Sequence, residues 1–117
     1  MGTYREAISH VMLAYKGKFE RDVNLKQILE CLTLKKVIGT NDYQEQIEKP
    51  AEKQAEFLVR IIPNKGLDGF RALWECLKEK EPTFAKKLLE SLGEQNKECE
   101  QIIRNGGAGQ QQQELTE

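Results

Sequence analysis

Residues 57–77 constrain the fold more than any other stretch, because two apolar helical patterns meet there across a short run of helix-breaking residues. Before the break, the spacing i, i+3, i+4, i+7 that forms one helix face is met by Ala55, Leu58, Val59 and Ile62. After it, the same spacing is met by Phe70, Leu73, Trp74 and Leu77. Pro63 removes an amide donor and Gly66 readily takes a left-handed conformation, so the chain is predicted to turn back between the two helices. We therefore expect a helical hairpin with facing apolar stripes, in which Phe70 and Trp74 are the largest buried side chains.

Apolar patterns of helical spacing also occur outside the hairpin, in residues 1–23, 25–36, 41–48 and 84–92. Gly17 lies inside the first pattern and predicts a bend or a break there. Asn24 is a suitable cap for the helix that follows it. With the hairpin this gives six helices and no strand pattern, so the chain is predicted to be all-α. Because the connections are short, neighbouring helices are expected to pack antiparallel.

The composition limits the class of protein. The chain has 117 residues, enough for one domain, with 38% hydrophobic and 32% charged residues. A net charge of −1 lacks the basic excess typical of nucleic-acid binding, so no nucleic-acid partner is expected. No apolar run is long enough to cross a bilayer, and the N-terminus does not look like a secretion signal. We therefore expect a cytoplasmic protein that does not insert into membranes.

Residues with catalytic or metal-binding chemistry are few. The single histidine, His10, has no partner in a recognisable motif, although spacing alone does not exclude a Cys–His pair. The glycines at 66 and 69 lack the length and the lysine of a phosphate-binding loop. Three widely spaced cysteines, Cys31, Cys76 and Cys99, are interpreted as partly buried free thiols rather than a redox or metal site. We expect no enzyme, no cofactor, no metal and no small-molecule substrate, and an enzyme with an unrecognised site is the last alternative.

The C-terminal part changes character after Leu92. An a/d heptad frame is met by Ala85, Leu88, Leu92, Gln95, Cys99 and Ile102. Residues 93–104 are therefore either the start of a coiled coil or an extension of the last helix. Residues 105–117 are rich in glycine and glutamine and are predicted to be disordered, which leaves residues 1–92 as the bundle. An alternative function follows from the heptads, namely a structural helical bundle that caps a coiled-coil oligomer.

Residues 4–92 resemble a caspase recruitment domain (CARD) of the death-fold superfamily. The resemblance is carried by 25–29 (LKQIL), 36–38 (KVI), the small acidic helix 41–48, and 57–66 (FLVRIIPNKG) with Phe70 downstream. Many relatives have an acidic residue and a leucine where Ile61 and Ile62 stand here. The resemblance implies a six-helix antiparallel Greek-key bundle with a bent first helix, and a non-enzymatic module that binds other CARDs or itself.

The heptad frame beyond Leu92 is also similar to scaffold proteins that place a CARD before a coiled coil, including the guanylate-kinase type. A CARD at the head of an initiator caspase or a receptor fits the bundle equally well. In each case the resemblance implies an adaptor or scaffold role in signalling of the apoptotic or innate-immune type.

The resemblance also implies where such a module binds: a surface on helices one and four meets a surface of opposite charge on helices two and three of the next molecule. The acidic candidates, in the third helix, are Asp42, Glu45 and Glu48. The basic candidates, in the first and fourth helices, are Lys16, Lys18, Arg21 and Arg60. Glu52 and Glu56 occupy fourth-helix positions where strongly basic relatives carry arginine. A head-to-tail contact between the two surfaces would build a filament if its rotation does not close.

Overall fold

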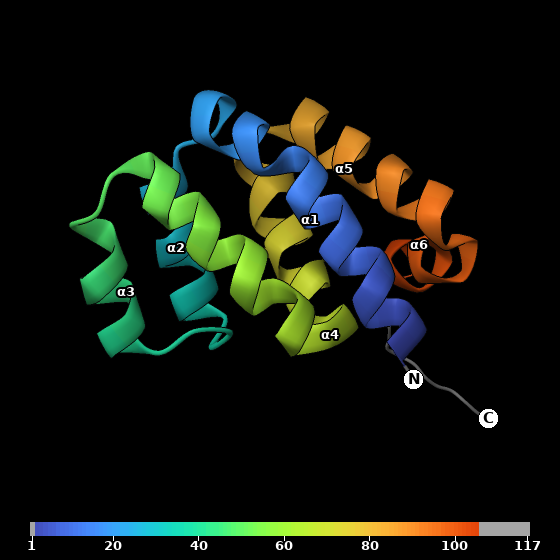
Figure 1. Ribbon diagram of the computed structural model, residues 1–117, viewed down its shortest axis with the longest axis horizontal. Coiled ribbons are helices and arrows are strands. Elements are labelled where there is room, and N and C mark those ends of the chain that lie inside the picture. Colours follow the sequence, from blue (N-terminus) through green and yellow to red (C-terminus); the bar gives the residue numbers. More distant parts are fainter. Residues whose placement is uncertain (1, 106–117) are drawn as a thin grey trace.

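The structure, a computed structural model, describes residues 2–105, and within that range every regular element is a helix (Figure 1). In chain order these are α1 (Gly2–Asp22), α2 (Leu25–Leu34), α3 (Thr40–Ile47), α4 (Ala51–Lys80), α5 (Pro82–Gln95) and α6 (Lys97–Arg104). The predicted all-α class is therefore confirmed.

The predicted hairpin lies within α4, which contains a kink at Gly66. Gly66 has φ 71° and ψ −158°, a backbone conformation that side-chain-bearing residues rarely adopt. Residues 51–65 and 67–80 are thus two helices, and with α1, α2, α3 and α5 they make the six expected ones. Pro63 does not start the turn as predicted: it is buried inside the helix, which continues to the glycine. α6 is an additional helix.

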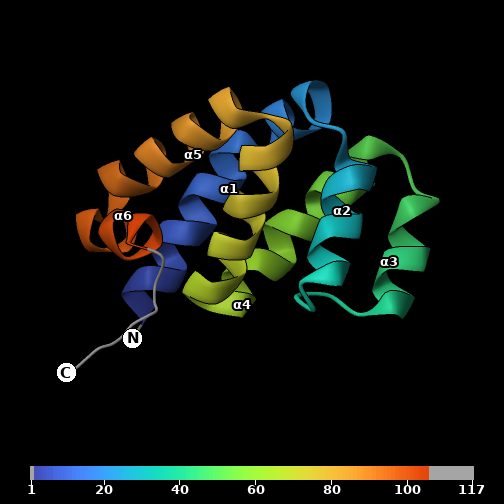
Figure 2. The same ribbon diagram turned by 180° about the vertical axis from the view of Figure 1, so that it is seen from behind.

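The core lies between α1, α4 and α5, which run side by side through the middle of the molecule, while α2 and α3 lie at one end (Figures 1 and 2). Ile8, Met12 and Phe19 of α1 and Phe70 of α4 are fully buried. Trp74 is only partly buried: it packs against the edge of the core, and the Lys78 ammonium lies 4.3 Å from its ring centroid. The sequence-based expectation that Trp74 anchors the core is therefore wrong, and Phe70 has that role.

α1 remains helical through Gly17, and its last turns veer away from the axis of the earlier turns in both views (Figures 1 and 2). The predicted bend is present without a break in the helix. The cap predicted at Asn24 is also present: its side chain accepts a hydrogen bond from the Gln27 amide at 3.4 Å.

The heptad frame predicted beyond Leu92 is interrupted at Asn96, whose extended backbone (φ −159°) ends α5. The Asn96 side chain then caps α6 by accepting from the Cys99 amide at 3.2 Å. Because α6 folds back onto the bundle, Cys99 and Ile103 are buried in the bundle core and do not form a separate coiled-coil interface. The described residues thus contain no continuous coiled-coil stripe through this region. The limits of the domain at residues 92 and 104 stay predictions, and the tail 106–117 lies outside the described residues.

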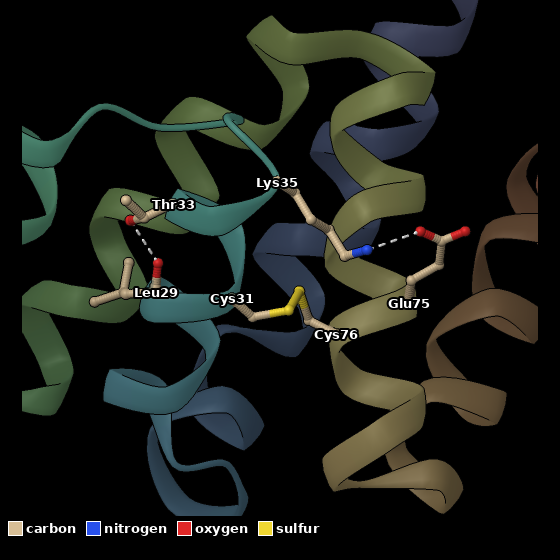
Figure 3. The surroundings of a disulfide bond; sticks show 6 residues. All are labelled: Leu29, Cys31, Thr33, Lys35, Glu75 and Cys76. Atoms are coloured by element: carbon tan, nitrogen blue, oxygen red, sulfur yellow. Dashed lines mark hydrogen bonds and ion pairs between the residues drawn. A yellow bond between two sulfur atoms is a disulfide. The ribbon is translucent and has the colours of Figure 1, made fainter.

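Cys31 of α2 and Cys76 of α4 form a disulfide, with their Cα atoms 6.0 Å apart (Figure 3). The interpretation of both as free thiols is therefore corrected. Forty-five residues separate them in the sequence, and only the packing of α2 against the second half of α4 brings them together. Cys99 is a buried free cysteine, and burial raises the pKa of its thiol.

Candidate protein interface

The acidic residues predicted from the sequence lie along α3 and at its C-terminal end. α3 is the short helix at one edge of the bundle (Figures 1 and 2). Asp42, Glu45 and Glu48 are three residues apart and form what we call the α3 acidic face. The Glu45 side chain is 64% exposed, and its carboxylate lies 3.8 Å from the Lys49 ammonium. An ion pair this exposed contributes little to stability, about 0–1 kcal/mol. The α3 acidic face therefore stays available to a partner.

The opposite side of α3 is fixed to the bundle. Tyr43 and Ile47 pack against the core, and the Gln54 side chain of α4 donates a hydrogen bond to the Gln46 carbonyl at 3.1 Å. A helix of eight residues with few apolar side chains is held in one orientation by these contacts. They keep Glu45 and Glu48 directed outward.

The basic residues predicted from the sequence lie on α1 and α4, and each has its own neighbours. Lys16 of α1 pairs with Glu20 at 2.9 Å, and this hydrogen bond raises the pKa of Lys16, with smaller contributions from Glu56 and Glu52 of α4. The surface shared by α1 and α4 thus surrounds Lys16 with carboxylates. These carboxylates reduce the positive charge that the predicted contact requires around Lys16.

The other three cations lie elsewhere. The Lys18 ammonium is 4.8 Å from the Tyr15 ring centroid and lines a groove between α1 and α5. The Arg60 guanidinium lies 5.5 Å from the Phe57 ring centroid, in a groove between α3 and α4. Arg21 is exposed near the end of α1. Their assignment to one docking surface stays a prediction.

A set of cations that was not predicted as a site lies around the end of α2 and the second half of α4. Lys35, Lys36, Lys65 and Arg71 line one groove there. They come from segments about thirty residues apart in the sequence, and only the α2–α4 packing, which also joins Cys31 to Cys76, brings them together.

Other functional chemistry has little support in the part of the chain that the structure describes. No group of three or more histidine, cysteine or acidic side chains in residues 2–105 is arranged to hold a metal ion. The same residues contain no helix that is long and apolar enough to cross a bilayer. The polar residues lie instead in open grooves and on exposed helix faces.

An all-helical bundle with its polar residues on open faces is the architecture of the death-fold interaction domains. The model of the caspase recruitment domain family matches residues 9–91, and the chain belongs to that family. No curated protein and no solved structure matches the chain significantly. CARDs are protein–protein interaction domains that associate with other CARDs, and the family is not one of enzymes.

Proposed function

We propose that this CARD recruits other CARDs, further copies of itself included, through the α3 acidic face. The observation that carries the proposal is the exposure of Glu45 and Glu48 on a helix whose opposite side is packed on the bundle. Charged side chains that form no buried ion pair within the molecule can attract a partner of opposite charge and fix its orientation. Family membership supports the wider role, that of an adaptor or scaffold module in cytoplasmic signalling of the apoptotic or innate-immune type.

The alternative, a structural bundle that caps a coiled coil, depended on one continuous heptad frame. The interruption at Asn96 removes that support within the described residues, because Cys99 faces the bundle core. The interaction module is therefore the function that the geometry favours.

The double variant Glu45→Lys/Glu48→Lys tests the proposal by light scattering at increasing protein concentration in low salt. Two reversed charges on the docking surface are expected to weaken self-association by about tenfold or more, because repulsion replaces attraction across the contact. Both side chains are exposed, so helicity and the melting temperature are expected to stay unchanged.

The matched control is Glu79→Lys/Glu90→Lys, which changes the net charge equally at exposed positions of α4 and α5. This control is expected to associate as the unmodified chain does. If the α3 variant associates as strongly as the control, the α3 acidic face is not a docking surface.

A further inference from the structure

The basic groove, as we call it, has a volume of ≈ 420 Å³ and opens between the C-terminal end of α2 and the second half of α4. Its charged lining residues are Lys35, Lys36, Lys65, Asp68, Arg71 and Glu75. Lys35 pairs with Glu75 across the groove, at 3.4 Å (Figure 3). Apart from the Lys35–Glu75 pair, Lys36 and Lys65 face one carboxylate, that of Asp68, so the groove keeps a positive excess.

Lys36 is held in an unusual backbone conformation, with φ 64°, the only positive φ of a non-glycine residue in the described part of the chain. It follows α2 in the position that usually holds glycine. Its amide donates to the Thr33 carbonyl at 3.0 Å, and the next amide, that of Val37, donates to Leu32 at 2.9 Å. This cap uses backbone groups alone, so a glycine would form it with less strain.

The fold therefore does not explain why a lysine occupies position 36. Within residues 4–105, neither Lys36 nor Lys65 has a hydrogen bond or an ion pair through its ammonium group. Strained residues of this kind are concentrated at functional sites. Two unpaired ammonium groups in one groove are suited to a partner that supplies carboxylates.

On the α1–α4 surface, Lys16 and Lys53 are each paired with a carboxylate. Lys16 is surrounded there by Glu20, Glu52 and Glu56, and Lys53 is paired with Glu56 at 3.6 Å. An acidic helix that approached Lys16 would meet these carboxylates, although Lys49, Lys53 and Arg60 add positive charge in the neighbouring groove. The basic groove presents a positive excess.

We propose that the basic groove receives the α3 acidic face of a second copy of this chain, with Lys36 and Lys65 meeting its carboxylates. This inference rests on the proposed function, because it names the surface that the α3 acidic face binds. We propose a head-to-tail contact, which leaves one acidic face and one groove exposed at the ends.

Complementation between two variants tests the pairing by sedimentation velocity in low salt. Lys36→Glu/Lys65→Glu reverses the groove and keeps the α3 acidic face, whereas Glu45→Gln/Glu48→Gln neutralises that face and keeps the groove, so the two altered surfaces do not attract each other. Each variant alone is expected to be about tenfold or more weaker in self-association than the unmodified chain. An equimolar mixture is expected to form a dimer and nothing larger, because one intact contact remains and both ends are blocked.

The matched control for the groove variant is Lys26→Glu/Lys86→Glu, two exposed lysines on α2 and α5 outside the groove. This control is expected to associate more strongly than the groove variant. Equal association by the two would overturn the inference.

Lys36→Gly is a second variant, which distinguishes an effect on binding from an effect on the stability of the fold. It removes the ammonium group and relieves the left-handed strain, so the melting temperature is expected not to fall while self-association weakens several-fold. Self-association as strong as that of the unmodified chain would overturn the role of Lys36.

The outcomes distinguish the inference from the proposed function. If the α3 variant loses association and the groove variant keeps it, the α3 acidic face binds another surface and only the inference fails. If neither variant loses association, or the unmodified chain does not associate, the proposed self-recruitment fails and the inference fails with it.

Discussion

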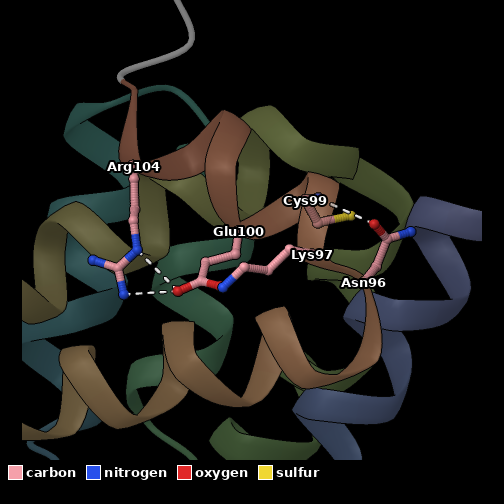
Figure 4. A network of polar contacts seen from close by, with 5 residues as sticks. All are labelled: Asn96, Lys97, Cys99, Glu100 and Arg104. Atoms are coloured by element: carbon pink, nitrogen blue, oxygen red, sulfur yellow. Dashed lines mark hydrogen bonds and ion pairs between the residues drawn. The ribbon is translucent and has the colours of Figure 1, made fainter.

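Glu100 lies between α5 and α6 with only 8% of its side chain exposed. Two cationic side chains form ion pairs with its carboxylate (Figure 4). Its carboxylate is 3.0 Å from the Lys97 ammonium and 2.7 Å from the Arg104 guanidinium. Gly93 of α5 makes room for it, because a Cβ at that position would overlap the carboxylate. A glycine inside a helix is unfavourable by about 1 kcal/mol relative to alanine, and here the close approach of α6 explains it.

The hydrogen bonds from Arg104 and Lys97 hold the pKa of Glu100 below its usual value of 4.5. A carboxylate whose pKa is lower in the folded state stabilises the fold above 4.5, and this contribution is lost as the pH falls through the lowered pKa. Glu100→Gln is therefore expected to lower the free energy of unfolding at neutral pH and to flatten its decline below pH 4.5.

Urea denaturation followed by circular dichroism from pH 7 to pH 3 measures this effect. Glu94→Gln, an exposed carboxylate on α5, is the control and is expected to unfold as the unmodified chain does. A Glu100→Gln curve that is parallel to that of the unmodified chain at every pH would show that the ion pairs do not stabilise α6.

At the scale of elements, the Cys31–Cys76 disulfide ties α2 to the second half of α4 and closes a loop of 45 residues. A cross-link over a loop of this length stabilises mainly by restricting the unfolded chain, by roughly 2–4 kcal/mol. In a reducing compartment the two cysteines stay thiols and this contribution is absent. The same helices line the basic groove, so the disulfide also holds the two sides of the groove together.

Cys31→Ser is expected to lower the free energy of unfolding by roughly 2–4 kcal/mol under oxidising conditions. With excess dithiothreitol, the unmodified chain is expected to unfold at nearly the same urea concentration as this variant. Cys99→Ser serves as the control, because Cys99 is free and its variant should keep the response to reductant. A midpoint of the unmodified chain that does not move on reduction would contradict a stabilising disulfide.

Helical periodicity in the sequence was sufficient to predict the six helices and the turn between residues 51–65 and 67–80, because each helix buries one apolar stripe. The same periodicity gave a wrong prediction of burial at two places, because the packing of the helices determines burial there. Trp74 has the spacing of a core residue but lies at the margin of the core. The heptad frame continues in the sequence beyond Asn96, whereas the chain turns there and buries Cys99.

The charged residues could be identified from the sequence, but not their grouping in space. The α3 acidic face was predictable because its members lie on one short helix. Lys16, Lys18 and Arg60 have different neighbours, since positions around a helix axis and the neighbouring helices decide what surrounds each one. The strain at Lys36 has no sequence signature, because lysine is ordinary near the end of a helix.

At the scale of the whole molecule, charge of opposite sign lies on two separate surfaces of a small bundle whose net charge is only −1. If the α3 acidic face of one copy binds the basic groove of the next, a head-to-tail contact leaves one of each surface exposed at the ends. Both surfaces are exposed, and the contact is therefore expected to weaken as salt is added.

NMR mapping of the capped dimer tests the central claim, that the α3 acidic face of one copy binds the basic groove of another. ¹⁵N-labelled Lys36→Glu/Lys65→Glu is titrated with unlabelled Glu45→Gln/Glu48→Gln, and the labels are then exchanged. The predicted result is that amide shifts change at residues 42–48 in the first titration and at residues 35–37 and 65–75 in the second. Shift changes confined to α1 and the first half of α4, in either titration, would contradict the account.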